Sequence, residues 1–247
     1  VGGAEGMPGA ARLTAEAALR GGAGLVTVAT AASHAASIVT ARPELMVTGI
    51  DSESALDDLI ARASVIACGP GLDVTDWSRM LLSRVLASGK PMVLDADALN
   101  LMSEDRTSWS GVDVPCIITP HPGEAARLLG KSTEAVQGDR LQALADLVDL
   151  TGATAVLKGA GTLVGHVDSV PSICPFGNPG MSAPGMGDVL TGRIAALLAQ
   201  GRDAATAARA GVLVHALAGD SAARRGERGL LAGDLLAELR HWLNPRH

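Results

Sequence analysis

Apolar positions along the chain fall into two alternating patterns. Short runs rich in β-branched residues are apolar at nearly every position, as in "GLVTVAT" (24–30), "SVIACGPG" (64–71) and "KPMVLDADAL" (90–99). Runs without polar alternation are typical of parallel strands covered on both faces. The pattern therefore predicts strands there, and it predicts others at the start of 114–130, at 154–159, and as a pair at 162–167 and 169–176.

Segments with helical spacing separate these runs. We expect helices at 10–20, 54–63, 76–88, about 133–151, 187–200, 203–222 and about 232–242, with another after the turn within 114–130. Strands that alternate with helices of this length form right-handed βαβ units. No internal repeat or linker is recognisable, so the prediction is a single α/β domain over residues 1–247.

The segments that follow the predicted strands are rich in glycine, proline and aspartate. In open parallel sheets, ligands bind beyond the carboxyl ends of the strands. We therefore expect the opening segment and the strand ends to converge on one ligand-binding edge. These strand ends are "CGPG" (68–71), "DADALN" (95–100), "TPHPGE" (119–124) and "KGAGT" (158–162).

Composition narrows the classes of function. The 247 residues are 47% hydrophobic and 19% charged, which supplies a sizeable core and argues against intrinsic disorder. The net charge is −6 and the basic residues are scattered, which argues against a nucleic-acid surface. With one Phe, three Trp and no Tyr, the chain lacks the aromatic platforms on which single-stranded nucleic acids stack.

Cysteine usage and hydropathy indicate the compartment. Cys68, Cys116 and Cys174 are an odd count without CxxC spacing, so neither a zinc site nor a disulfide framework is indicated. No apolar run approaches the roughly 18 residues of a membrane helix. The first ten residues also lack the basic region of a signal peptide. We expect a cytoplasmic protein without membrane partners.

The stretch "GNPGMSAPGMGDVLTG" (177–192) holds five glycines around the start of a predicted helix. Glycines there leave the first N–H groups of the helix approachable, and the helix dipole favours an anion such as phosphate. Beside a bound phosphate, Asp188 could act as general base for a hydroxyl that attacks it. The alternative is that Asp188 only caps the helix, and the sequence leaves both roles open.

Two further strand-end segments carry candidate chemistry. "KGAGT" (158–162) could offer backbone N–H groups and the Lys158 ammonium to a nucleotide, or it could be a hairpin turn with a solvated lysine. His121 lies between two prolines, which would present it outward, or it only begins the next helix. Glu124, in the first turn of that helix, is a weaker candidate for holding Mg²⁺.

The remaining polar motifs give weaker signals. Asp95 and Asp97 could bind a metal or could accept hydrogen bonds from neighbouring loops. "LLGKST" (128–133) is not a P-loop, because position 125 is Ala, and no GxGxxG fingerprint is completed. Since the other histidines share no ligand spacing, we assign no metal ligand.

Seven motifs occur in order along almost the whole chain. They are "GMPGAARLTAEAALRGGAGLVTV", "RPELMV", "ACGPGL", "VLDADALN", "ITPHPGEAARLLG", "VLKGAGTLV" and "GNPGMSAPGMGDVLTG". In this order the chain strongly resembles the ADP/ATP-dependent NAD(P)H-hydrate dehydratases of the ribokinase-like superfamily. The resemblance implies a three-layer fold with a mainly parallel central sheet and helices on both faces.

The resemblance also implies a reaction. Family chemistry phosphorylates the C6 hydroxyl of the S-form of hydrated NADH or NADPH from ADP, or from ATP in eukaryotic members. Loss of phosphate then restores NAD(P)H and leaves AMP, a lyase reaction in metabolite repair. We accordingly expect ADP, with ATP as an alternative, together with Mg²⁺ and a homotetramer.

Family site residues transfer only where this sequence matches the motifs. Ala10, Gly71 and His121 match positions that contact the hydrate, and Asp188 matches the substrate-contacting base. The positions that match nucleotide contacts are Lys158, Gly159, Ala160, Gly161, Thr162 and Gly187.

The sequence departs from the family in two places. Pro184 and Met186 replace smaller or polar residues in the glycine-rich turn, which implies a weaker phosphate contact and a lower rate. The strand that usually leads into "VGG" is also expected before Val1.

Two other functions are compatible with the same sequence motifs. A ribokinase-like kinase for a small molecule such as a vitamin precursor would share Asp188 and the glycine turn, but it would release ADP from ATP. A catalytically silent homologue would bind adenine nucleotide without turnover.

Overall fold

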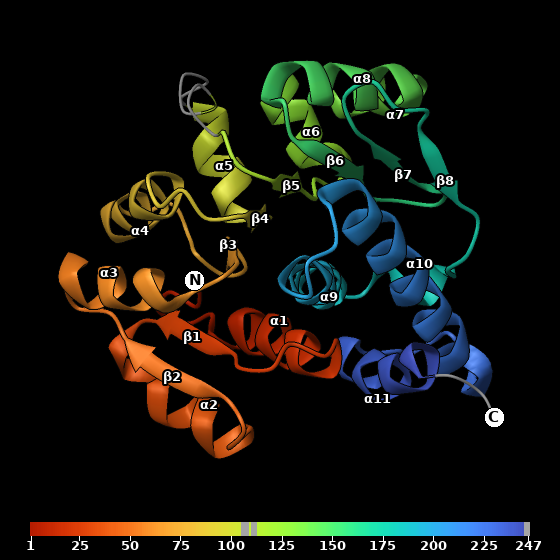
Figure 1. The fold of residues 1–247 in the computed structure, drawn as a ribbon. Helices are drawn as coiled ribbons and strands as arrows, with labels where there is room; N and C mark the ends of the chain where they lie inside the picture. The colour runs from red at the N-terminus through yellow and green to blue at the C-terminus, as the bar shows by residue number, and fades with distance from the viewer. Residues whose placement is uncertain (105–108, 110–112, 245–247) are drawn as a thin grey trace.

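The main sheet of the protein has six strands in chain order (Figure 1). The computed structural model describes residues 1–104, 109 and 113–244. The strands are β3 (Ile66–Cys68), β4 (Met92–Leu94), β5 (Cys116–Ile118), β6 (Thr154–Leu157), β7 (Thr162–Gly165) and β8 (Ser172–Cys174). Strands β3 to β6 are parallel, and β7 and β8 are antiparallel. The predicted mainly parallel sheet is confirmed.

A smaller parallel sheet lies beside the main one. It consists of β1 (Thr27–Thr30) and β2 (Met46–Gly49). Residues 1–4 run between β1 and β3 and bond to both: the Val1 amino group donates to Ala67 O at 2.7 Å, and Gly2 N donates to Ala29 O at 3.0 Å. The opening segment thus joins the two sheets. The strand expected before Val1 stays a prediction.

Helices cover both faces of the main sheet. One face packs against α9 (Met186–Ala199) and α10 (Ala204–Ala222), and the other against α4 (Asp76–Leu86) and α8 (Arg140–Thr151). The other helices are α1 (Pro8–Arg20), α2 (Ala35–Ala41), α3 (Glu53–Arg62), α5 (Asp97–Glu104), α6 (Pro122–Leu129), α7 (Thr133–Gly138) and α11 (Ala232–Leu243). Short 3₁₀ turns occupy Ala32–His34, Pro179–Ser182 and Ala223–Arg225. Among the described residues, none of these helices combines the length and apolarity that a membrane span needs.

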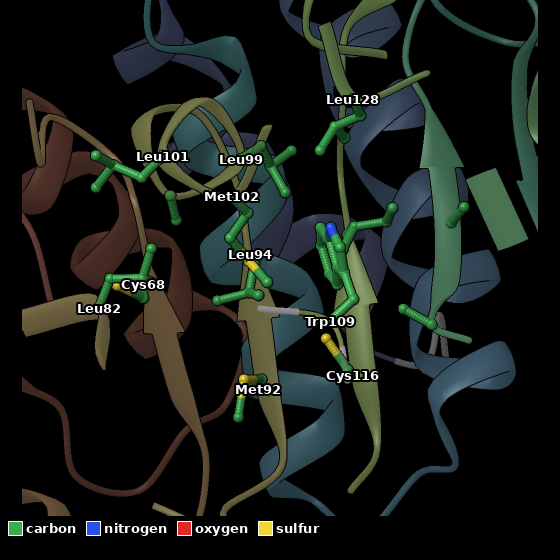
Figure 2. Close-up of a cluster of buried hydrophobic side chains, with 14 of the residues drawn as sticks. Cys68, Leu82, Met92, Leu94, Leu99, Leu101, Met102, Trp109, Cys116 and Leu128 are labelled. Carbon is green, nitrogen blue, oxygen red and sulfur yellow. The ribbon is translucent and has the colours of Figure 1, made fainter. Parts of the chain in front are cut away.

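Successive residues of one strand enter opposite cores. Met92 and Leu94 of β4 pack with Leu99 and Leu128 in the core shown in Figure 2, whereas Val93 packs against α9 and α10. Both faces of the strand are therefore buried. This burial explains why the apolar runs in the sequence show no polar alternation.

The structure corrects two predicted elements and adds elements that were not predicted. The strand expected at 90–99 ends at Leu94, and Asp97 begins α5. The helix expected at 133–151 is two helices, because the Asp139 side chain accepts a bond from Gln142 N and starts α8 anew. The segment between Thr30 and Ile50 holds α2 and β2, which the sequence pattern did not predict.

Helix α9 lies at the centre of the fold. Its residues from Val189 to Leu198 are buried on all sides, so it has no polar face. Close packing against α1 depends on Gly192, since a Cβ there would come within 1.9 Å of Thr14 O. This packing fixes the start of α9 at the carboxyl edge of the sheet.

An apolar cavity of about 550 Å³ lies between the two sheets. It is lined by residues of α1, β1, α3, β3 and α9, including Val28, Leu56, Ile66 and Ala195. None of the predicted site residues lines it. The cavity is therefore separate from the candidate site at the strand ends.

Candidate active site

The first turn of α9 forms one wall of the candidate site. Its N-cap is Gly185, with a φ of 87° that favours glycine, and no side chain caps the helix. Asp188 is the third residue of the helix, so it does not act as the cap, and that alternative is excluded. Without a capping side chain, the first N–H groups of the helix are open to an anion.

Asp188 has no polar partner among the residues that the structure describes. Its carboxyl group makes no hydrogen bond or ion pair with them. Burial and the charge of Asp95 raise the pKa of Asp188 to about 6, although the Lys158 charge acts in the opposite direction. A carboxylate with such a pKa is ionised at neutral pH and remains basic enough to take a proton from a hydroxyl group.

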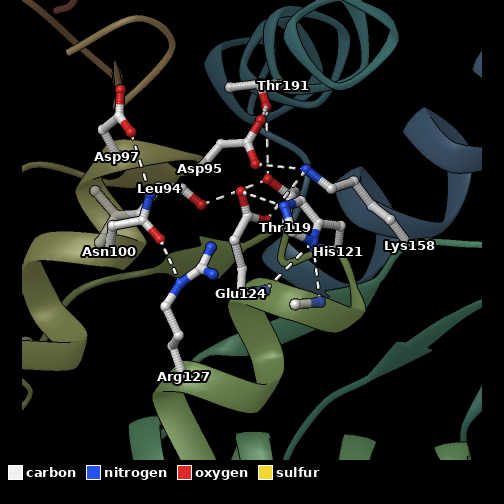
Figure 3. A network of polar contacts seen from close by, with 11 residues as sticks. Leu94, Asp95, Asp97, Asn100, Thr119, His121, Glu124, Arg127, Lys158 and Thr191 are labelled. Atoms are coloured by element: carbon white, nitrogen blue, oxygen red, sulfur yellow. Dashed lines mark hydrogen bonds and ion pairs between the residues drawn. The ribbon is translucent and has the colours of Figure 1, made fainter. Parts of the chain in front are cut away.

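Lys158 is the centre of a buried charge network (Figure 3). Its Nζ lies 2.7 Å from Asp95 Oδ1 and 3.6 Å from Glu124 Oε2. A Cβ on Gly187 would lie 3.2 Å from the same Nζ, so the ammonium borders the first turn of α9. Although burial opposes it, attraction to Asp95 and Glu124 raises the pKa of Lys158. The alternative of a solvated turn lysine is excluded.

Asp95 connects Lys158 to α9. It is 1% exposed, and its Oδ2 accepts a hydrogen bond of 2.7 Å from Thr191 Oγ1, one turn after Asp188. Burial opposes ionisation, but the Lys158 charge and these hydrogen bonds lower the pKa of Asp95. The carboxylate thus holds the ammonium and α9 in a fixed relation.

His121 is the N-cap of α6. Its Nδ1 accepts bonds from Gly123 N at 3.0 Å and Glu124 N at 3.3 Å. Burial and the Lys158 charge lower the pKa of His121. The neutral ring therefore carries its proton on Nε2, which lies 3.3 Å from Glu124 Oε1. Half of the side chain is exposed, so Nε2 can face a ligand.

The remaining carboxylates are engaged with the protein. Glu124 Oε2 accepts a bond of 2.7 Å from His121 N, which completes a capping box. Asp97 Oδ2 accepts a bond of 2.8 Å from Asp73 N, which is the bond to a neighbouring loop that the sequence left open. Among the described residues, no three His, Cys, Asp or Glu side chains form a group that could hold a metal ion.

Ala10 and Gly71 lie against each other at the same edge. Gly71 has a φ of 61°, and a Cβ there would lie 3.1 Å from Ala10 Cβ and 2.8 Å from Met7 O. Only glycine fits this approach between the β3 loop and the start of α1. The two residues thus contact each other where the β3 loop meets the start of α1.

Met186 points away from the glycine-rich turn. Its side chain is 5% exposed and packs with Val189, Leu230 and Leu235 in an apolar cluster. The turn therefore offers its backbone, and not this side chain, to a ligand. Whether Pro184 and Met186 lower the rate stays a prediction.

The structure brings together four of the predicted site residues. Lys158, Gly187, Asp188 and His121 meet around the network at the ends of β4, β5 and β6. Sequence reasoning did not single out Thr191, whose hydroxyl reaches Asp95. The spacing of one helical turn from Asp188 is a signal that could have identified it.

Comparisons with known proteins identify the family of the chain. A family model described as NAD(P)H-hydrate dehydratase matches residues 1–241. The bifunctional NAD(P)H-hydrate repair enzyme Nnr of Coxiella burnetii is 49% identical over 99% of this chain, which covers 50% of that protein. The ADP-dependent (S)-NAD(P)H-hydrate dehydratase of Neisseria meningitidis is 38% identical over 100% of this chain and 84% of its own length. The chain thus spans about half the length of the bifunctional relative.

Solved structures show the same fold. The ADP/ATP-dependent NAD(P)H-hydrate dehydratase of Bacillus subtilis, co-crystallised with ATP and Mg²⁺, superposes with a TM-score of 0.86. It is 28% identical, and the match covers 98% of this chain and 86% of that chain. A ribokinase-like superfamily protein of Enterococcus faecalis superposes with a TM-score of 0.88, at 31% identity over 98% of this chain and 84% of its own.

Proposed function

Because the chain belongs to the NAD(P)H-hydrate dehydratase family, we propose that it removes water from the S-form of hydrated NADH or NADPH at the expense of ADP. The observation that supports this most is Asp188. It is a partly buried carboxylate without a protein partner among the described residues, and it lies at the uncapped start of α9. The site therefore places a base beside a place suited to phosphate.

In the proposed first step, the C6 hydroxyl of the hydrate attacks the β-phosphorus of ADP. Asp188 takes the hydroxyl proton as the new oxygen–phosphorus bond forms. The bond from that phosphorus to the bridging oxygen breaks, and AMP leaves with the bonding electrons. The N–H groups of the first turn of α9 stabilise the negative charge on the phosphoryl group in transit.

In the second step, the C6–oxygen bond breaks and inorganic phosphate leaves. Loss of a proton from C5 restores the ring double bond and gives NADH or NADPH. Phosphate is a far better leaving group than hydroxide, which is why a phosphoryl transfer precedes the elimination. The protein must exclude water from the transferring group, and the buried position of the Lys158 network supports this.

Each substrate is assigned its own part of the site. We assign Ala10, Gly71 and His121 to the hydrate, in line with the family motifs that they match. Ala10 and Gly71 contact each other, and the His121 ring offers one N–H donor. The nucleotide is assigned to Gly187 and to the loop 158–162. In that loop, the N–H groups of Gly159, Ala160 and Gly161 have no partner among the described residues.

The finer features of the reaction are also proposals. ADP is the preferred nucleotide and ATP a poorer one, in line with the name of the Neisseria relative. Mg²⁺ enters with the nucleotide phosphates, because the described residues offer it no cage of their own. We place the protein in the cytoplasm as a homotetramer, without nucleic-acid or membrane partners.

The test compares nucleotides and epimers. The protein is incubated with Mg²⁺, ADP or ATP, and the separated S- and R-forms of hydrated NADH, and the return of NADH absorbance is followed. We expect turnover of the S-form alone, faster with ADP. Release of ADP from ATP, with no return of NADH, would instead identify a small-molecule kinase.

A further inference from the structure

Arg140, the first residue of α8, contacts the loop 158–162. Its Nη2 donates to Leu157 O at 3.2 Å and to Gly161 O at 3.3 Å, and both terminal nitrogens lie 3.4 Å from Lys158 O. One guanidinium group thus binds three carbonyl oxygens, two of the loop and one at the end of β6. Its remaining bond, from Nη1 to Gln137 Oε1 at 2.8 Å, lies outside the loop.

The bonds to carbonyl oxygens determine where the N–H groups point. In a planar trans peptide, the C=O of one residue and the N–H of the next are antiparallel. Because Lys158 O faces Arg140, the N–H of Gly159 faces away from it. Gly159 O accepts a bond of 2.9 Å from Thr162 Oγ1, so the N–H of Ala160 points away from that hydroxyl.

These N–H groups are free of protein partners. The described residues provide no acceptor for the N–H of Gly159, Ala160 or Gly161, although Lys158 N donates to Pro120 O at 2.9 Å. Arg140 and Thr162 thus hold the carbonyl groups of Lys158, Gly159 and Gly161, while the N–H groups of residues 159–161 stay open. Successive free N–H groups of this kind form an anion-binding concavity.

The charge of Arg140 is not balanced by a carboxylate. No ion pair joins it to an acidic group within the described part of the chain, and burial lowers the pKa of Arg140. A cation bonded to carbonyl oxygens also polarises the peptide groups and strengthens their N–H donors. Arg140 therefore fixes the conformation of the loop through its hydrogen bonds and strengthens the loop's N–H donors through its charge.

From these contacts we infer that Arg140 is a positioning residue that holds the loop 158–162 in the form that binds the nucleotide. This inference rests on the proposed function, because it takes the loop as the nucleotide site. Arg140 need not touch the nucleotide. Gly159 fits closely against it, since a Cβ there would lie 2.7 Å from Arg140 Nη1.

The test measures ADP binding to the full chain by calorimetry, and then steady-state kinetics. Arg140→Ala removes several hydrogen bonds from a charged donor, so the Kd for ADP rises by at least about tenfold. The Kd for ADP of Arg140→Lys lies between the values of the original protein and of Arg140→Ala, because one ammonium group cannot reach three carbonyl oxygens in this geometry. At saturating ADP, kcat and the KM for the hydrate stay within about twofold of the original values.

Arg209→Ala is the matched control. Arg209 also donates to a loop carbonyl, Val170 O at 3.2 Å, but it lies on α10 away from the nucleotide loop. Its loss leaves the Kd for ADP unchanged. Millimolar guanidinium ion restores ADP affinity to Arg140→Ala, whereas the neutral analogue urea does not.

Three results would overturn the inference. These are an unchanged Kd for ADP in Arg140→Ala and Arg140→Lys, a loss confined to kcat, or a loss that guanidinium cannot restore. A chain that binds ADP but never forms NADH from its hydrate would refute the proposed dehydratase activity instead. In that case the comparison of ADP affinities still decides the role of Arg140.

Discussion

Asp188 differs from the other buried carboxylates of the site in lacking a partner. Asp95 is held by Lys158 and Thr191, and Glu124 by His121 and Lys158. Both are thereby committed to the structure. Among the described acidic residues around Lys158, Asp188 is the group free to exchange a proton with a substrate.

Replacing Asp188 tests its assignment as the base. We expect Asp188→Asn to lower kcat by at least about a hundredfold, the usual range for loss of a general base. The Kd for ADP, measured by calorimetry, stays close to the original value because the backbone of the turn is retained. Unchanged kcat in the variant would remove Asp188 from this role.

The pH dependence of the reaction follows from the pKa of about 6 for Asp188. The base must be ionised, so kcat/KM rises with pH below about 6 and levels off above it. A profile of kcat/KM from acidic to neutral pH, taken where the fold is intact, measures this limb. A profile that stays flat through this range contradicts the assignment.

His121 combines two functions that substitutions can separate. Its Nδ1 caps α6, and its Nε2 carries the proton that faces the site. Asn can replace the Nδ1 acceptor, so His121→Asn keeps the free energy of unfolding but raises the KM for the hydrate. His121→Gln loses the cap and about 1 kcal/mol of stability. Denaturant unfolding and steady-state kinetics of both variants check this, and equal effects on both properties would contradict it.

At the scale of elements, the packing of α9 against α1 positions the catalytic turn. Gly192→Ala would push a methyl group against Thr14 O, and we expect a loss of about 1–3 kcal/mol in the free energy of unfolding. Gly233→Ala in α11 is the control. Its new Cβ meets no atom within 4 Å, so the helix gains up to about 1 kcal/mol. Equal stability of the two variants in urea would contradict the close helix contact.

Seven of the eight strands in the described part of the chain, and most of its helices, could be predicted because their sequence patterns reflect burial. Strands such as β4 are covered on both faces, which produces apolar runs that stand out from their surroundings. Helix α5 was missed because its first residues were assigned to the strand expected at 90–99. Helix α2 and strand β2 were missed because they lie at the half-exposed margin. Their patterns carry little of this signal.

At the scale of the whole molecule, the site forms where the ends of parallel strands meet. This rule predicted that Asp95, His121 and Lys158 would converge, and the structure places them in one network. Thr191 and Arg140 could not be predicted in the same way. Their roles depend on which side of α9 and α8 faces the sheet edge, a matter of tertiary packing.

Analysis of all products of the reaction tests most directly whether phosphoryl transfer from ADP drives the dehydration. The protein is mixed with Mg²⁺, ADP and the S-form of hydrated NADH, and AMP, phosphate and NADH are quantified together. We predict that all three appear in equal amounts and that none appears without ADP. NADH formed without AMP, or AMP formed without NADH, would contradict a dehydration driven by phosphoryl transfer.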